Sequence, residues 1–561
     1  MARFCYRYIG GLAVTASALL LTGNATAQGP SQRLNKAHDA YPTPRIAFDE
    51  EPVPPPADDS LSAAIADSFT SNPGLGARRY DLRATDDEVG IAMSQTRPSA
   101  QVQLSGGYEL TLPGAITQAN RPLSDRLNDP NIERNDLASQ FVIDQPIYTG
   151  GRAASALRAA LAGSVAGRET LRGAEGDLLV DLIAAYTDVR RDGRSLVIRQ
   201  RNLRTLEATL DEIAARRDAG ELTRTDIAQA ETQVQAARVQ LNAAETQLES
   251  SRAAFTAIVG REPGNLAQEP GLPDLPRTAD EAFAMAEASN PDLAAAIATA
   301  HASQARIAAA QAEGRPELSI RGTAGTTGPA AHFDRADQDV TFTGRATLTI
   351  PLFAGGRIRS AVAQARNRQT ADTLRIEATR RQLVQAIVNA WNQWVTADRN
   401  ALAQDLQVQA ARIYYEGTLE EYREGLRSTF DVLYAQNSLN ETQIALLGSK
   451  RDRYVAQAIL LRHLGQLETK RLLANPPVYA PDDYLEKVER RSAVPWGGVI
   501  RTIDRLGAPS GRPRAPEMPE SQASALPAAA SPAQAPLDLM RGGPTASETR
   551  SPSTATPRTK P

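Results

Sequence analysis

Two stretches of this 561-residue sequence nearly repeat each other: QPIYTGGR at residues 145–152 and IPLFAGGR at residues 350–357. Their prolines are 351 − 146 = 205 residues apart. The same offset relates four further landmarks: Gly220 and Gly425, Asp226 and Asp431, Ala230 and Ala435, and Gly260 and Gly465. A constant offset over so long a stretch predicts two copies of one structural unit. The repeated strand-to-helix motif consists of Pro146, Gly150, Gly151 and Arg152 in the first copy and Pro351, Gly355, Gly356 and Arg357 in the second.

A second offset holds upstream of this motif. Asn72-Pro73 matches Asn290-Pro291, and Pro98 matches Pro316, both at a spacing of 218 residues. The difference, 218 − 205 = 13, assigns 13 additional residues to a loop of the first copy. We therefore expect a first repeat over 58–270 and a second over 271–470. Each repeat comprises a helix, a strand, a loop, a second strand and long helices.

The helical part of each copy has a heptad pattern. In the first copy Ile227, Val234, Leu241, Leu248 and Phe255 recur every seven residues, which is typical of coiled-coil packing. The preceding stretch of 67 residues, Arg152 to Asp218, would reach about 100 Å as one helix. A rod of that length does not fit an ordinary globular core. We expect Trp391 and Trp394 to be packing residues of the second copy.

Four short segments alternate apolar and polar residues, and we expect strands at about 99–110, 138–148, 316–324 and 339–351. The clearest has Val340, Phe342 and Leu348 on one face and Thr341 and Thr343 on the other. This period of two is typical of outer-membrane strands, although a half-buried soluble strand has it too. The smallest membrane barrels need about eight strands, so two, three or four copies of the chain would have to share one.

The ends of the chain differ from its middle. Residues 1–27 have the three parts of a secretory signal peptide: Arg3 and Arg7, an apolar run, and the cleavage pattern Ala25-Thr26-Ala27. Residues 28–57 read as a Pro-rich N-terminal extension, and 509–561 as a disordered Pro/Ala-rich tail. After the leader no apolar stretch approaches the length of a transmembrane helix, so a membrane span would have to be built of strands.

Composition argues against enzymatic chemistry. The single cysteine, Cys5, lies in the leader, and the four histidines are far apart and form no HExxH motif. We expect no catalytic, cofactor-binding or metal-binding residues. The formal net charge is −3, so no basic field predicts a nucleic-acid partner.

Three features together resemble the outer-membrane efflux protein family of TolC-like channels. They are the duplicated Asn-Pro-x-Leu at 72–75 and 290–293, the repeated Gly-Gly-Arg motif, and the run Gly-Leu-Arg-Ser-Thr-Phe-Asp-Val-Leu at 425–433. The resemblance implies a mainly α fold with a membrane β-barrel. A homotrimer would form a long coiled-coil tunnel across the periplasm, and four strands per chain would contribute to a shared 12-stranded barrel. Residues 471–508 would form an equatorial C-terminal segment.

The same resemblance implies partners and a location. The protein would lie in the outer membrane of a Gram-negative bacterium, in contact with outer-membrane lipid. A periplasmic membrane-fusion adaptor and an inner-membrane pump of the RND or ABC type would engage the tunnel. The Gly-Gly-Arg motif and the segment from Ala185 to Arg191 resemble members associated with type I secretion.

The resemblance also implies a periplasmic gate at two helix tips. Residues 220–226 resemble the first tip and suggest Thr225 and Asp226 as acceptors; residues 422–431 resemble the second and suggest Tyr422, Arg427 and Asp431. Some members have a second aspartate where this chain has Tyr434, so a double aspartate ring is not expected. Ordinary helix capping is the alternative interpretation of these residues.

These observations favour an exit duct that serves drug efflux or type I secretion and passively conducts substrates from the pump. A soluble periplasmic coiled-coil adaptor would share the leader and the heptads but would lack the paired strands. An exported enzyme has no convergent set of catalytic side chains in its favour.

Overall fold

A computed structural model of the chain describes residues 59–128, 132–220, 222–273, 275–330, 338–473, 479–491 and 493–506. The chain divides into two units, Met1–Ala57 and Asp58–Pro561, and all described residues belong to the second. The predicted leader, Pro-rich extension and tail therefore lie outside the described residues.

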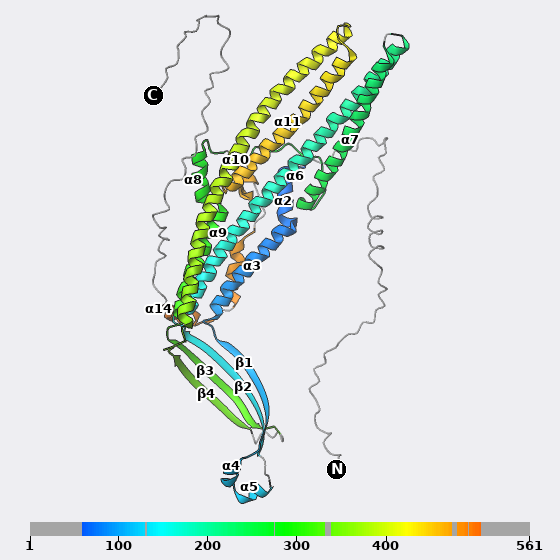
Figure 1. The fold of residues 1–561 in the computed structure, drawn as a ribbon. Helices are drawn as coiled ribbons and strands as arrows, with labels where there is room; N and C mark the ends of the chain where they lie inside the picture. Colours follow the sequence, from blue (N-terminus) through cyan, green and yellow to red (C-terminus); the bar gives the residue numbers. More distant parts are fainter. Residues whose placement is uncertain are drawn as a thin grey trace, which may run out of the picture. The chain divides into compact units, whose positions relative to one another are not determined.

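Both copies contain the same elements in the same order (Figure 1). The first copy comprises α2 (Leu61–Ser71), α3 (Pro73–Ser94), β1 (Ser99–Thr111), β2 (Ile132–Tyr148), α6 (Arg152–Asp218) and α7 (Arg224–Val259). The second comprises α8 (Ala279–Ser289), α9 (Pro291–Ala312), β3 (Glu317–Pro329), β4 (Asp339–Thr349), α10 (Arg357–Arg423) and α11 (Thr429–His463). The longer loop of the first copy contains α4 (Ala115–Ala119) and α5 (Leu123–Asn128).

The four strands form one antiparallel sheet in the order β1-β2-β3-β4. One row of facing residues runs through Val102, Phe141, Ala324 and Phe342, so the apolar positions of all four strands share a face. The neighbouring rows carry threonine, glutamine and charged side chains on the opposite face. The sheet thus has one apolar and one polar face.

Two strands are longer than their alternation predicts. β2 begins at Ile132 rather than near residue 138, and β3 runs to Pro329 rather than to about 324. The added residues, such as 133–136 and 325–328, are polar or glycine and carry no alternating apolar pattern. Backbone pairing with neighbouring strands extends the ladder there, as between Ile132 and Thr111.

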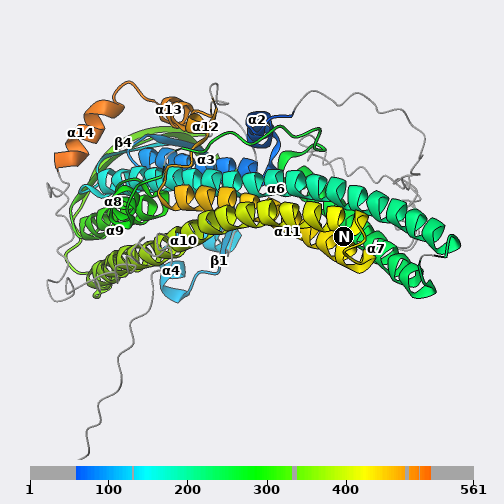
Figure 2. The ribbon, with the colours of Figure 1, turned by 90° about the horizontal axis from the view of Figure 1, so that it is seen from above.

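Helices α6 and α10 are each 67 residues long, and each turns back into a shorter helix, α7 or α11. Figure 2 shows α6 between α3 and α11, and α6 contacts both. The main core surrounds α6, where Tyr186 is fully buried and donates its hydroxyl to the carbonyl oxygens of Asp59 (2.9 Å) and Ala267 (2.8 Å). On α7 the heptad residues Val234, Leu248 and Phe255 are buried.

Glycine geometry repeats with the sequence. Every described glycine with a positive φ belongs to a pair separated by 205 residues, and each pair lies at the same turn of the two copies. These pairs are Gly150 and Gly355, Gly151 and Gly356, Gly220 and Gly425, and Gly260 and Gly465. The left-handed backbone of these turns explains why glycine recurs there.

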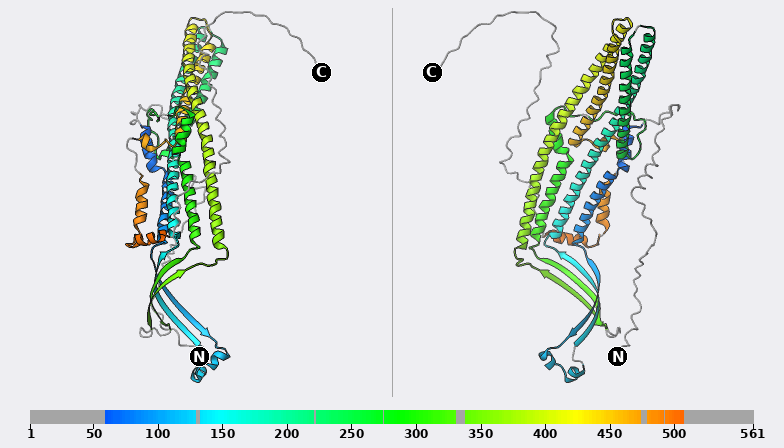
Figure 3. Two further views of the ribbon diagram at one scale, coloured as in Figure 1. Left: turned by 90° about the vertical axis from the view of Figure 1, so that its left-hand side faces the viewer. Right: turned by 45° about the vertical axis from the view of Figure 1, so that its right-hand side comes forward.

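Three short helices follow the second copy: α12 (Thr469–Leu472), α13 (Pro481–Arg491) and α14 (Gly497–Leu506). Of these, α13 lies alongside α3 (left panel of Figure 3), and the hydroxyl of Tyr484 on α13 donates to Asp87 on α3 at 2.9 Å. No described helix combines the length and apolar character that crossing a membrane would need.

Candidate functional site

The predicted gate residues lie at the two hairpin tips, where α6 turns into α7 and α10 turns into α11. Gly220 and Gly425 make these turns with φ of 86° and 77°. A Cβ at either position would meet no atom within 4 Å, so the backbone conformation, and not close packing, requires glycine.

Asp226 and Asp431 form equivalent capping boxes. Asp226 accepts from the backbone N–H and hydroxyl of Thr223 at 2.9 and 2.8 Å. Asp431 accepts from the same two groups of Ser428 at 3.1 and 2.8 Å. Hydrogen bonds from the Thr223 backbone and hydroxyl lower the pKa of Asp226, and bonds from the Ser428 hydroxyl and backbone lower the pKa of Asp431. Both carboxylates are therefore held in the ionised form.

Tyr422 connects the second tip to the first copy. Nη1 of Arg216 on α6 donates to the hydroxyl oxygen of Tyr422 at 3.2 Å, and its guanidinium carbon lies 5.2 Å from the ring centroid. The tyrosine oxygen is the acceptor in this contact. The two hairpins of one chain are thus joined by a charge-assisted bond.

Arg427 pairs within its own tip. Its Nε donates to Oε2 of Glu421 at 2.8 Å, and about half of each side chain is exposed. This bond with Glu421 raises the pKa of Arg427. Thr225 is exposed on the first turn of α7. Within the described part of the chain, no hydrogen bond or ion pair joins Thr225 or Asp226 to Tyr422, Arg427 or Asp431.

An aromatic pair lies beside the second tip. Phe430 and Tyr434 stack with ring centroids 6.3 Å apart, and they are 53% and 61% exposed. Tyr434, where no second gate aspartate is expected from the sequence, presents an exposed aromatic ring. The tip therefore combines aromatic surface with ionised carboxylates and an exposed guanidinium. That combination can make reversible polar contacts.

The strand-to-helix motif forms the turns that lead from β2 into α6 and from β4 into α10. Arg152 pairs with Glu317 at 3.2 Å, and Arg357 pairs with Glu313 at 2.5 Å. Pro146 lies at a register shift between β2 and β3. The first turn thus fixes its arginine against the start of β3, and the second fixes its arginine against the end of α9.

The first of these turns has a partner that sequence reasoning missed. Asp504 on α14 is 1% exposed and accepts from the backbone N–H groups of Thr149 (2.7 Å) and Ala154 (3.1 Å). It also accepts from the Thr149 hydroxyl at 2.8 Å and from the N–H of Gly151 at 3.3 Å. The carboxylate therefore caps α6 from a distant part of the chain, and no local motif around residue 504 indicates this role.

Among the described residues, no group of three or more His, Cys, Asp or Glu side chains is arranged to hold a metal ion. The polar groups described above are suited to hold helix ends and tips in place.

Both tips and both strand-to-helix turns lie within a region that matches known proteins. The model of the family described as outer membrane efflux protein matches residues 64–261 and 283–466, more than half of the chain. The Brucella suis outer membrane efflux protein BepC is 28% identical over 446 residues, covering 80% of this chain and 93% of the relative.

Solved structures share the fold. The Campylobacter jejuni CmeC outer membrane channel superposes with a TM-score of 0.63 at 16% identity, covering 79% of this chain and 94% of that one. The open state of the Neisseria gonorrhoeae MtrE outer membrane channel has a TM-score of 0.61 at 21% identity, covering 73% and 90%. The resemblance seen in the sequence is confirmed, as are the helix-and-strand fold and the outer-membrane location. The chain belongs to the outer membrane efflux protein family.

Proposed function

We propose that this protein is the exit duct of a tripartite export system. Three copies would share one 12-stranded barrel in the outer membrane and one helical tunnel in the periplasm. The duct would passively conduct substrates delivered by an inner-membrane pump and a periplasmic adaptor. This proposal extends the family assignment to oligomeric state, partners and mechanism.

The main observation in support of this proposal is that both edges of the sheet are exposed. β1 and β4 are the two edge strands, 13 and 11 residues long, and every residue of both is exposed. Long unpaired edges invite pairing with another chain. Pairing of β4 of one copy with β1 of the next would satisfy both edges. It would also close the sheet with its apolar face toward lipid, as the alternation of membrane strands requires.

The two tips support a gate at the other end of the duct. Asp226 and Asp431 already accept hydrogen bonds in the capping boxes of their own helices. The other polar contacts at the tips are the exposed Arg427–Glu421 pair and the partly buried contact between Tyr422 and Arg216. We propose that Thr225, Asp226, Tyr422, Arg427 and Asp431 of adjacent subunits hold the tips together at rest. Three copies of Asp431 would make an acidic ring that favours cations.

The names of the relatives support an efflux system more than protein secretion. BepC is named an efflux protein, and CmeC and MtrE are described as channels. We therefore propose an efflux system as the first assignment for the pump and adaptor. Type I secretion stays the alternative suggested by the Gly-Gly-Arg motif. Family membership argues against the soluble adaptor considered from the sequence.

Planar-bilayer conductance of the detergent-purified mature protein tests the duct. We expect discrete, cation-selective steps, because the ring of Asp431 attracts cations. Asp431→Asn keeps an acceptor for the Ser428 cap while removing the charge, so it should lower cation selectivity. A protein that inserts into the bilayer without conductance steps would overturn the proposal.

Arg427→Ala tests the gate with a matched control. Arg423 lies one turn away, is exposed and pairs with Glu420 at 2.7 Å, so Arg423→Ala removes the same charge from the same tip. We expect Arg427→Ala to raise single-channel conductance and Arg423→Ala to leave it unchanged. Equal conductance in the two variants would contradict the role given to Arg427.

A further inference from the structure

Helix α14 lies where the sheet meets the long helices. Its buried Asp504 fixes it to the first turn of α6, as described above. At its other end Nε1 of Trp496 donates to Oε1 of Gln145 on β2 at 3.3 Å. Gln145 faces Ile320 in the register and shares a face with Phe141 and Ile143. The indole of Trp496 therefore lies at the end of the apolar face of the sheet.

The exposed side of α14, together with Trp496 just before the helix, is apolar. Trp496, Val499, Ile503 and Leu506 are spaced as one face of a helix and are 51%, 64%, 37% and 84% exposed. Ile500, on the inner side, is buried. A tryptophan at the rim of an apolar surface is typical of the membrane interface, where the ring is buried and its N–H stays hydrogen-bonded.

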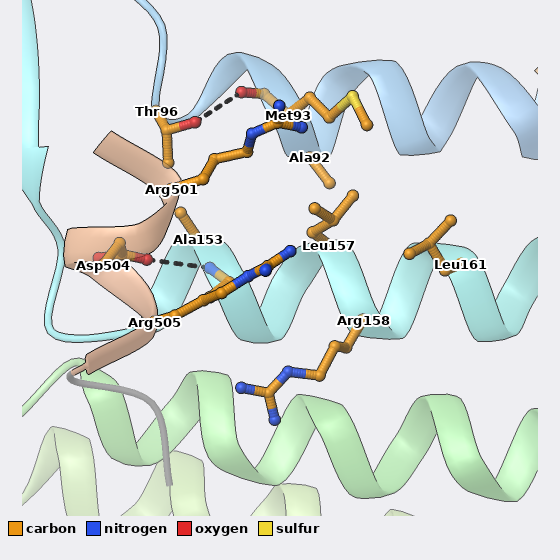
Figure 4. A pocket seen from close by; sticks show the side chains of 11 residues that line it. Ala92, Met93, Thr96, Ala153, Leu157, Arg158, Leu161, Arg501, Asp504 and Arg505 are labelled. Atoms are coloured by element: carbon orange, nitrogen blue, oxygen red, sulfur yellow. Dashed lines mark hydrogen bonds between the residues drawn. The ribbon is translucent and has the colours of Figure 1, made fainter. Parts of the chain in front are cut away.

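A pocket lies on the inner side of α14, between the end of α3 and the start of α6 (Figure 4). Its volume is about 220 Å³. Its polar lining comes from Arg158, Arg501, Arg505 and Asp504, and its apolar lining includes Met93 and Leu157. The pocket is smaller than the roughly 300–1,000 Å³ of typical small-molecule sites but has room for a headgroup phosphate.

The charge around this pocket is uncompensated. None of Arg97, Arg158, Arg501 and Arg505 forms an ion pair with a described residue. Asp504 is the acidic group in the pocket, and both of its oxygens are occupied by the start of α6. Nη1 of Arg97 is buried and has no hydrogen-bond partner in the described chain. Burial, followed by the charge of Arg501, lowers the pKa of the Arg97 guanidinium.

Several partly buried or buried arginines elsewhere in this protein form ion pairs. Arg462, for example, contacts Asp177 at 2.7 Å and Asp292 at 3.2 Å. Beside the exposed apolar face of α14, by contrast, the partly buried Arg97 and Arg501 and the exposed Arg158 and Arg505 keep guanidinium donors that no described carboxylate engages. Guanidinium groups bind phosphate with two parallel hydrogen bonds, and arginine near a membrane surface is attracted to anionic headgroups.

We propose that α14 is an interfacial helix seated in the periplasmic leaflet of the outer membrane, and that its arginine pocket binds the phosphate of a phospholipid headgroup. The apolar face of α14 enters the acyl region to a depth of roughly 5–10 Å. The acyl chains of the bound lipid run along the adjoining apolar face of the sheet. The inference rests on the proposed function, because it requires that sheet to lie in the membrane.

Tryptophan fluorescence tests the position of α14. The chain has three tryptophans, and Trp391→Phe with Trp394→Phe leaves Trp496 as the single reporter. The protein is reconstituted with phospholipids brominated either near the headgroup end or near the methyl end of the acyl chains. We expect strong quenching of Trp496 by the first lipid and weak quenching by the second.

A second reporter separates this inference from the proposed function. Trp496→Phe with Leu104→Trp, in the same background, places the probe on the apolar face of β1. If the Leu104→Trp reporter is quenched and Trp496 is not, the membrane placement of α14 is wrong while the membrane placement of the sheet stands. A second copy of the chain that covers α14 would give this result. Absence of quenching at both positions would overturn the membrane placement of the sheet, and the inference with it.

Native mass spectrometry tests the arginine pocket. The double variant Arg501→Gln with Arg505→Gln is compared with the double variant Arg204→Gln with Arg412→Gln. These two control arginines are exposed and lie toward the tip ends of α6 and α10. The same spectrum counts subunits and so verifies assembly. Each arginine near an anionic lipid surface changes affinity about fivefold, so the pocket variant should lose most bound phosphatidylglycerol and the control should keep it.

An excess of inorganic phosphate distinguishes the two possible sources of the anion. We expect phosphatidylglycerol to stay bound, because its acyl chains contribute to binding. Displacement of the lipid by inorganic phosphate, or equal lipid retention in the two variants, would overturn the lipid site.

Discussion

Helices α6 and α10 have the same length, the same entry motif and the same kind of turn at the tip, yet their surroundings differ. α6 buries eighteen of its residues, whereas α10 buries seven. α3, α7, α9 and α11 all contact α6, while α10 lies at the edge of the described helices. On α10, Leu374, Leu402, Leu406 and Ile413 are between 58% and 72% exposed. The two copies thus share their backbone geometry but differ in burial. The apolar side of α10 stays exposed in the single chain, and a neighbouring subunit would cover it.

The largest effect should follow from charging that exposed side of α10. Leu402→Asp with Leu406→Asp should abolish the proposed trimer. Burial of each leucine contributes about 1.5–3 kcal/mol, and burial of an unpaired carboxylate costs several kcal/mol more. Subunit counting by native mass spectrometry measures the result. Asn400→Asp, an exposed polar position on the same helix, adds a charge outside the apolar stripe and should leave the trimer intact. A stable trimer in the double variant would show that this face is not an interface.

The equivalent glycines at the ends of α7 and α11 should differ in their tolerance of a side chain. Both have positive φ, 85° at Gly260 and 68° at Gly465. A Cβ at Gly465 would collide with the backbone of Ser289 and Asn290, whereas at Gly260 it would meet the Ser71 hydroxyl at 3.1 Å. We expect Gly465→Ala to cost about 3–5 kcal/mol and Gly260→Ala about 1–2 kcal/mol. Thermal melting in detergent checks the order, and equal shifts would contradict the difference in packing.

The start of α6 is capped by Asp504 on α14, whereas no hydrogen bond from a side chain of the described residues reaches the first backbone N–H groups of α10. Asp504→Ala should cost about 1–3 kcal/mol, because it leaves backbone donors of Thr149, Gly151 and Ala154 unpaired. Hydrogen exchange should increase at residues 149–154 and stay unchanged at 354–359. Thr502→Ala, at an exposed position of α14, is the control. Unchanged exchange at residues 149–154 would refute the capping role of Asp504.

The smallest effect concerns pH at the two tips, where the copies are alike. A lowered carboxyl pKa stabilises the folded tip above the ordinary value of 3.8, and this contribution is lost as the pH falls through the lowered pKa. Protection from hydrogen exchange should therefore be constant from pH 7 to about 5 and fall at both tips in more acidic solution. Asp226→Asn and Asp431→Asn should each flatten the response of its own tip. Loss of protection above pH 5, or at one tip alone, would contradict the equivalence of the capping boxes.

Much of the backbone could be predicted because it depends on local sequence motifs, and each of these motifs occurs once in each copy. The 205-residue spacing located the paired turns, and the Gly-Gly-Arg motif located the starts of α6 and α10. Period-two alternation indicated all four strands but missed the polar ends of β2 and β3, where pairing across the sheet decides the strand length.

The candidate sites were less accessible to sequence reasoning. Within a single chain, Asp226 and Asp431 complete capping boxes with the N-cap residues Thr223 and Ser428, which lie three residues before them. The gate interpretation of these residues stays a prediction, because it concerns contacts between subunits. Asp504 and the arginine pocket were missed. They depend on contacts between residues more than 300 positions apart, and neither local period nor motif indicates such contacts.

The subunit count of the detergent-purified mature protein tests the central claim most directly. Native mass spectrometry should give the mass of three chains, because in the proposed trimer three sheets of four strands would close one 12-stranded barrel and would cover the exposed sides of β1, β4 and α10. A single chain, stable in detergent with its sheet edges open, would contradict the account.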